Sequence, residues 1–202
     1  MNDKQEDILE LKKKRKLKGD HNVGNIMSVI CVCKILGIET GIIQEGIAGF
    51  TGLEHRMEYV GRVKDIKFYN DSIATIPEAC IEAVKALGRV DTLILGGFDR
   101  GIDYSLLATF LSTSGIRNFI FTGEAGQRIR SEIENNKRPE QQLYSIDHFD
   151  EFLEIALHCT KPGTICLLSP AAASYNEFQN FEIRGNRFKD LILGKPGLKA
   201  EI

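Results

Sequence analysis

Residues 167–188 read Leu-Leu-Ser-Pro-Ala-Ala-Ala-Ser-Tyr-Asn-Glu-Phe-Gln-Asn-Phe-Glu-Ile-Arg-Gly-Asn-Arg-Phe, and they are the most informative stretch of the chain. An apolar run from Thr164 to Leu168 ends abruptly in Ser169-Pro170, and three alanines and Ser174 follow. A buried strand that stops in small residues leaves an open crevice at its carboxyl end, where α/β sheets hold ligands. The stretch therefore predicts both a central strand and a ligand site just beyond it.

Outward from this stretch, strands and helices alternate from Met57 onward. The predicted strands cover residues 58–63, 66–70, 92–95, 117–121, 142–146 and 164–168. The predicted helices cover residues 21–37, a short segment within 38–55, and 76–87, 105–112, 125–135, 149–159 and 186–193. Alternation at this pitch predicts a mostly parallel sheet with helices on both faces, a Rossmann-like α/β/α fold in three layers.

Composition narrows the class of protein. The 202 residues carry a formal net charge of -2, which favours neither nucleic acid nor an anionic membrane as a partner. No apolar run approaches the roughly 18–20 residues that cross a bilayer, and the N-terminus is charged, so we expect a cytoplasmic protein. Cys31-x-Cys33 lacks the spacing of a zinc or redox motif, so we predict no metal site.

Polar and glycine-rich segments follow four of the predicted strands. They are Asp71–Thr75, Gly96–Gly101, Thr122–Glu124 and Ser169–Ser174. Because the carboxyl ends of parallel strands meet at one edge of a sheet, these segments are expected to line that edge. Together they predict a site for a polar, anionic small molecule. Gly96-Gly97 also permits a tight strand exit without any ligand.

Five segments, taken in order, resemble the signatures of the Mur ligases, over about residues 19–193. They are Gly19-x-His21-Asn22-x-x-Asn25, Phe50-x-Gly52-Leu53-x-His55-Arg56-x-Glu58, Asn70-Asp71-Ser72-x-Ala74-Thr75, Gly96-Gly97-x-Asp99-Arg100-Gly101, and the stretch quoted first. The resemblance implies residues 1–55 to be the tail of a central ATP-binding domain with its hinge. It implies residues 56–202 to be the C-terminal, amino-acid-binding domain.

The resemblance also implies roles for single residues. ATP contacts fall on Asn22, Asn25, Arg56 and Asp71. In the branch of the family that adds D-glutamate, the amino acid is held at Thr75, Arg100, Ser174 and Phe181. Arginine suits this use because its guanidinium is a fixed fork of donors. His21 and His55 are expected to be hydrogen-bonded structural residues rather than bases.

The implied reaction joins D-glutamate to UDP-N-acetylmuramoyl-L-alanine through an acyl phosphate, with ATP and Mg2+ required by the complete enzyme. The sequence contains no G-x-x-G-K-[ST] phosphate loop. We therefore expect a portion of a ligase without its N-terminal and central domains, binding no cofactor tightly and inactive alone. Alternatives are a sibling Mur or folylpolyglutamate-type ligase, and a non-catalytic small-molecule-binding module.

The sequence departs from the family pattern at two positions. Ile73 and Arg100 stand where the family signatures have lysine. Structural alternatives also stay open for three of the predicted site residues. Thr75 fits the start of a capping box with Glu78, Arg100 fits a surface charge in a glycine turn, and Phe181 fits a core position.

Overall fold

The computed structural model describes residues 21–175 and 177–194. The chain forms two compact units, Met1–Gly52 and Leu53–Ile202, so the observed division falls three residues before the predicted one. The described part of the first unit contains α1 (His21–Ile35) and α2 (Thr40–Gly49), close to the predicted helices. The assignment of this unit to an ATP-binding domain stays a prediction.

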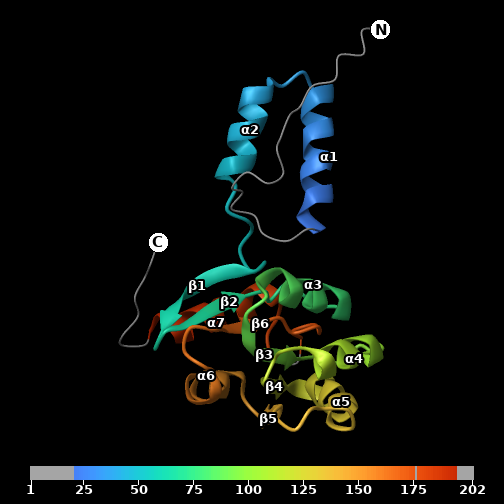
Figure 1. Ribbon diagram of the computed structural model, residues 1–202, viewed down its shortest axis with the longest axis vertical. Helices are drawn as coiled ribbons and strands as arrows, with labels where there is room; N and C mark the ends of the chain where they lie inside the picture. Colours follow the sequence, from blue (N-terminus) through green and yellow to red (C-terminus); the bar gives the residue numbers. More distant parts are fainter. Residues whose placement is uncertain (1–20, 176, 195–202) are drawn as a thin grey trace. The chain divides into compact units, whose positions relative to one another are not determined.

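The second unit is built on one six-stranded sheet (Figure 1). Its strands are β1 (Glu58–Val63), β2 (Ile66–Asn70), β3 (Val90–Gly96), β4 (Asn118–Thr122), β5 (Gln142–Ile146) and β6 (Ile165–Leu168). Their spatial order is β1-β2-β6-β3-β4-β5. Only the edge strand β1 pairs antiparallel; the four other pairings are parallel, as predicted.

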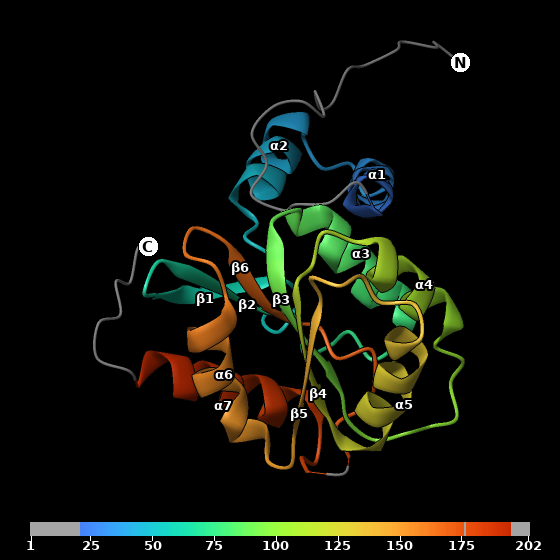
Figure 2. The same ribbon diagram turned by 60° about the horizontal axis from the view of Figure 1, so that its bottom comes forward.

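Helices cover both faces of this sheet, which confirms the predicted three layers (Figure 2). One face carries α3 (Pro77–Leu87), α4 (Ser105–Thr113) and α5 (Gly123–Glu134), and the other carries α6 (Phe152–Cys159) and α7 (Phe181–Leu193). Side chains alternate along each strand. In β3, Leu93 and Leu95 therefore pack in the core beneath α3, α4 and α5, and Ile94 packs in the core beneath α6 and α7.

The path of the chain places β6 between two strands that precede it. The chain runs from β2 to β3, β4 and β5 with helices α3, α4 and α5 on one face. It then crosses the other face through α6 and inserts β6 between β2 and β3. Right-handed crossovers in both directions produce this change of helix face. The sheet therefore has a topological switch point beside β6, where α/β sheets bind ligands.

The starts of two helices differ from the sequence expectation by more than about two residues. Helix α7 begins at Phe181 rather than at residue 186, because the Asn180 side chain accepts a hydrogen bond from the Ile183 amide at 2.8 Å and caps the helix there. The helix predicted over residues 149–159 opens with a 3-10 turn, Phe149–Glu151, before α6.

Candidate functional site

Three of the four residues predicted to bind the amino acid lie in loops that follow three adjacent parallel strands. Strands β2, β6 and β3 are neighbours, so their carboxyl ends open on the same edge of the sheet. Thr75 follows β2, Arg100 follows β3 and Ser174 follows β6, whereas Phe181 is the first residue of α7. The strand order thus places the loops that carry Thr75, Arg100 and Ser174 on one edge of the sheet.

Backbone hydrogen bonds join these loops to one another. The Phe98 amide donates to the Ala173 carbonyl at 2.8 Å and forms an isolated antiparallel bridge. The Gly96 amide donates to the Pro170 carbonyl, also at 2.8 Å. Two hydrogen bonds therefore join the end of β3 and the start of its loop to the loop after β6.

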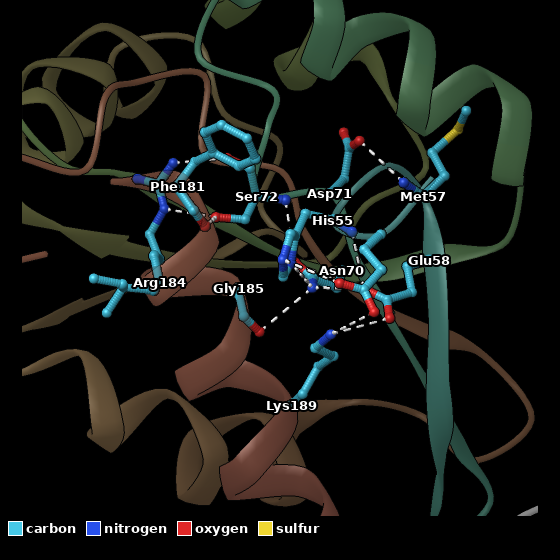
Figure 3. Close-up of polar contacts among 12 residues, drawn as sticks. His55, Met57, Glu58, Asn70, Asp71, Ser72, Phe181, Arg184, Gly185 and Lys189 are labelled. Atoms are coloured by element: carbon cyan, nitrogen blue, oxygen red, sulfur yellow. Dashed lines mark hydrogen bonds and ion pairs between the residues drawn. The ribbon is translucent and has the colours of Figure 1, made fainter. Parts of the chain in front are cut away.

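Arg184 of α7 adds hydrogen bonds to these loops and to the loop after β2, where Figure 3 shows its guanidinium beside Ser72. Its side chain is 1% exposed and donates to Ser72 Oγ and the Ser72 carbonyl at 3.0 and 2.9 Å. It also donates to the carbonyls of Ala172, Ala173 and Gly96 at 3.1–3.4 Å. Burial lowers the pKa of Arg184 to about 9, so the guanidinium stays charged at neutral pH. Sequence reasoning assigned this arginine no role.

Thr75 and Arg100 are in direct contact. Arg100 Nη2 donates to the Thr75 carbonyl at 2.6 Å, although the two residues lie in loops that follow different strands. Arg100 is exposed, and its guanidinium carries several further N–H donors with which to bind a carboxylate. The contact joins Arg100 to the loop after β2. The alternative in which Arg100 is only an isolated surface charge in a glycine turn is therefore incomplete.

The capping-box interpretation of Thr75 is wrong. Helix α3 begins at Pro77 with Ile76 in the N-cap position, and no side chain caps it. Thr75 lies one residue before the N-cap, where its hydroxyl is out of register with the helix amides that a cap must reach. The Thr75 side chain is partly buried, and its predicted role toward an amino acid stays a prediction.

Ser174 and Phe181 flank the aromatic-rich loop after β6. Ser174 is buried, and its carbonyl accepts a hydrogen bond from the Phe178 amide at 2.9 Å. Phe181 is partly buried, and its ring meets His55 edge to face with the ring centroids 6.0 Å apart. The Phe181 carbonyl accepts from Ser72 Oγ at 2.8 Å. Whether both residues touch a bound amino acid stays a prediction.

The residues predicted to contact ATP are divided between the two units. In α1, Asn25 Nδ2 donates to Asn22 Oδ1 at 3.1 Å, so these two side chains form a local pair. Arg56 and Asp71 belong to the second unit, and Arg56 is exposed. Each pair is placed by its own unit, and the use of all four on one nucleotide stays a prediction.

Asp71 is buried and its carboxylate faces the protein. Oδ1 accepts from the Met57 amide at 3.1 Å, and Oδ2 accepts from Ser169 Oγ at 2.7 Å. Burial raises the pKa of Asp71 to about 7, against the opposing effects of these two hydrogen bonds and of Arg56. A hydrogen bond from a ribose hydroxyl to Asp71 would therefore require the carboxylate to give up or share one of these partners.

His55 has the structural role predicted for it. Its Nδ1 accepts from Asn70 Nδ2 at 2.9 Å, because an amide nitrogen can only donate, and its backbone amide donates to Glu58 Oε2 at 2.9 Å (Figure 3). Asn70 also donates to Glu58 Oε2 at 3.0 Å, and Lys189 Nζ of α7 lies 3.3 Å from Glu58 Oε1. This network fixes the segment before β1 against β2 and α7.

Metal binding has no candidate within residues 21–175 and 177–194. No three His, Cys, Asp or Glu side chains of this part of the chain gather closely enough to hold a metal ion. Of the helices in the described part, none has the length and apolar character of a membrane span.

These features define a class of protein: a three-layer α/β/α domain whose site is formed by loops at the switch point of a mostly parallel sheet. Residues 55–172 match the family model described as Mur ligase, glutamate ligase domain. The chain belongs to this family.

Curated relatives extend the match beyond these residues. The UDP-N-acetylmuramoylalanine--D-glutamate ligase of Caldanaerobacter subterraneus subsp. tengcongensis is 36% identical over 178 residues, which cover 88% of this chain and 39% of the relative. The ligase of the same name from Oenococcus oeni is 37% identical over 181 residues, covering 90% of this chain and 40% of the relative. The chain thus spans about two fifths of the length of these relatives.

Solved structures share the fold at lower identity. UDP-N-acetylmuramate-alanine ligase from Thermotoga maritima superposes with a TM-score of 0.65 at 16% identity, over 88% of this chain and 39% of that one. MurF ligase from the same organism, solved in complex with ADP, gives a TM-score of 0.58 at 17% identity, over 88% of this chain and 40% of that one. At these identities the likeness concerns the fold alone.

Proposed function

We propose that this chain is the amino-acid-binding portion of an ATP-dependent ligase that joins D-glutamate to UDP-N-acetylmuramoyl-L-alanine in peptidoglycan precursor synthesis. The observation that carries the proposal is the contact of Arg100 with Thr75 at the carboxyl edge of the sheet. This contact holds the Arg100 guanidinium at the edge of the sheet where a ligand is expected. The curated relatives of the chain are named as D-glutamate ligases.

In this proposal the domain holds the incoming amino acid. Arg100 pairs with a carboxylate of D-glutamate, the hydroxyls of Thr75 and Ser174 donate to carboxylate oxygens, and Phe181 forms a wall of the site. Phosphoryl transfer from ATP converts the carboxylate of the muramoyl substrate into an acyl phosphate. The D-glutamate amine then attacks the acyl carbon, loses a proton and forms the C–N bond, while the C–O bond breaks and phosphate leaves. Positioning of the two reactants supplies much of the acceleration.

The nucleotide contacts are proposed from the resemblance to the family, residue by residue. Asn22 and Asn25 on α1, with Arg56 and Asp71 of the second unit, are proposed to contact ATP. Arg56 suits a phosphate because it is exposed and cationic. The remainder of the ATP site and any Mg2+ ligands would lie outside the described residues, and the cytoplasmic location stays a prediction.

The curated relatives favour this function over its alternatives. A sibling or folylpolyglutamate-type ligase would share the sheet and its loops, but the relatives at 36–37% identity are named for D-glutamate. A binding module without catalysis would keep the pocket without an ATP site. It is the less favoured reading, because the match to these relatives extends beyond the glutamate ligase domain.

Titration of the chain with D-glutamate by ligand-observed NMR tests the site. We expect weak binding that prefers D-glutamate to L-glutamate and is lost in Arg100→Ala and reduced in Ser174→Ala. Arg62→Ala is the matched control, since Arg62 lies on the edge strand β1. Equal binding by wild type and Arg100→Ala would reject the assignment of the pocket.

A chimera tests the reaction. The chain replaces the matching segment of the Caldanaerobacter relative, and phosphate release and amide formation are measured with D-glutamate, L-lysine and D-alanine. We expect turnover with D-glutamate alone. Phosphate release without amide formation would favour a site for another amino acid.

A further inference from the structure

The Arg128 side chain of α5 is hydrogen-bonded to the loop that carries Arg100. Its Nη1 donates to Asp99 Oδ1 at 2.6 Å, and its Nη2 donates to the Ile102 carbonyl at 3.0 Å. The guanidinium also lies over the ring of Tyr104, with its carbon 5.4 Å from the ring centroid. One side chain therefore contacts this loop at three points, on both sides of Arg100.

The helix that carries Arg128 is a fixed support. Ala125, Ile129 and Ile133 form one fully buried stripe of α5 against the sheet. The Ala125 amide donates to the Gly97 carbonyl at 3.1 Å, which ties the start of α5 to the start of the same loop. Because Arg128 precedes a buried position of a packed helix, its own backbone has little freedom.

The loop turns tightly around Arg100. Asp99 Oδ1 accepts from the Gly101 amide at 2.9 Å as well as from Arg128, so the residue before Arg100 is hydrogen-bonded both to the residue after it and to α5. Gly101 has φ 71, in the left-handed region that suits glycine. The direction of the Arg100 side chain thus depends on the orientation of the Asp99 carboxylate.

We propose that Arg128 is a positioning residue: through Asp99 and Ile102 it sets the direction in which Arg100 presents its guanidinium to a dicarboxylic amino acid. This inference rests on the proposed function, in which Arg100 binds a carboxylate of D-glutamate. Neither Arg128 nor Asp99 touches the amino acid in this arrangement.

The contribution of Arg128 is to geometry more than to folding stability. The side chains of Arg128 and Asp99 are 40% and 20% exposed, and ion pairs with this much contact to water stabilise a fold only weakly. A planar guanidinium that donates to two different residues of the loop nevertheless fixes orientation, and lysine cannot reproduce this geometry. Loss of Arg128 should therefore reduce ligand affinity while the melting temperature changes little.

The test uses the full chain and two measurements. D-glutamate affinity is measured by NMR titration, and 15N relaxation gives the order parameters of the amides of residues 99–102 without ligand. For Arg128→Ala we expect affinity to fall about fivefold or more and the order parameters to fall from about 0.85 toward 0.6. Arg128→Lys should restore little of either, because it keeps the charge and loses the fork.

Two control variants isolate the geometry. Arg130→Ala removes the same charge from α5, where Arg130 donates to Ser145 rather than to the loop, and should change neither measurement. Tyr104→Phe keeps the ring below Arg128, and the Tyr104 hydroxyl has no hydrogen-bond partner among the described residues. This variant should also bind as wild type does.

The outcomes separate the two proposals. If Arg100→Ala weakens binding and Arg128→Ala does not, the positioning role is overturned and the proposed function stands. If Arg100→Ala leaves binding unchanged, the pocket assignment fails, and the order parameters alone then decide whether Arg128 holds the loop. Full retention of affinity and loop order in Arg128→Lys would also overturn the role, since charge without geometry would suffice.

Discussion

Arg184 Nε donates to Ser72 Oγ at 3.0 Å, and this bond joins a helix near the end of the described chain to the loop after its second strand. The same hydroxyl donates to the Phe181 carbonyl at 2.8 Å. Arg184 has no carboxylate among its hydrogen-bond partners in the described part of the chain; its acceptors are this hydroxyl and four carbonyls. A buried cation of this kind organises loops rather than pairing with an acid.

Replacement of Arg184 by methionine should destabilise the second unit by about 3 kcal/mol or more. The change leaves several buried carbonyls without a donor, and each unsatisfied buried group costs roughly 1–3 kcal/mol. Urea unfolding followed by tyrosine fluorescence measures the effect. All five tyrosines lie in the second unit, and the chain has no tryptophan to obscure them.

Arg187→Met is the matched control, because Arg187 lies on the same helix and pairs with Asp150 at the surface. Exposed ion pairs contribute little to stability, so this variant should unfold almost as wild type does. Equal stability of the two variants would show that the loops hold together without Arg184.

Gly97→Ala should also destabilise the second unit, by about 3 kcal/mol. Gly97 has φ 137, and a Cβ built on it lies 2.2 Å from the Ala173 carbonyl oxygen. An alanine there must separate the loops after β3 and β6, and overpacking of this kind costs roughly 1–3 kcal/mol before the backbone strain is added. Gly115→Ala, with open space around its Cβ, should change the unfolding free energy by less than about 0.5 kcal/mol in the same urea experiment.

The order of elements and their type were predictable because local patterns carry them. Strand β5 was predicted with its observed bounds, and the Gly96-Gly97 exit was predicted from glycine alone. The predicted start of α7 at residue 186 is wrong, because the helix is capped at Asn180. Asn180 is a favourable N-cap residue, and that signal was available.

The assembly of the site was less predictable, because strand order is not written in local sequence. Nothing in the residues of β6 states that it lies between β2 and β3, and this insertion places the carboxyl end of β6 between the ends of the strands that precede Thr75 and Arg100. The role of Arg184 depends on acceptors supplied by three loops, so no spacing rule identifies it. The resemblance to a family identified the residues that are predicted to form the site. The hydrogen bonds that hold their loops in place could be seen only in the fold.

Asp71 should make the stability of the second unit depend on pH. Its folded pKa of about 7 lies above the ordinary aspartate value of 3.8, so between these values the folded state binds the proton and the unfolded state does not. Stability from this group is full below about pH 4 and is lost as the pH rises through 7. Cys80 and Ser169 also face this carboxylate, but burial raises the pKa of Cys80 to about 12, so its thiol stays neutral here.

The asparagine variant isolates this contribution. Asp71→Asn keeps an acceptor for the Met57 amide and cannot titrate. Between pH 5 and pH 8 the unfolding free energy of wild type should fall about 2–3 kcal/mol more than that of Asp71→Asn. Parallel pH profiles from urea unfolding would mean that Asp71 is ionised throughout this range in the folded protein.

Gly185→Ala reverses the usual effect of alanine in a helix. Alanine normally stabilises a helix interior by up to about 1 kcal/mol relative to glycine. Here a Cβ on Gly185 would lie 2.3 Å from His55 Nδ1 and 3.0 Å from Asn70 Nδ2, so we expect a loss of about 2 kcal/mol or more.

His55→Gly supplies the test of this cause. It removes the ring that the new methyl group meets, and glycine adopts the His55 backbone angle, φ 60, without strain. In a double-mutant cycle measured by urea unfolding, Gly185→Ala should cost much less in the His55→Gly background than in wild type. Additive costs would place the origin of the effect elsewhere on α7. The expected coupling would show that close approach of α7 to the segment before β1 requires glycine at position 185.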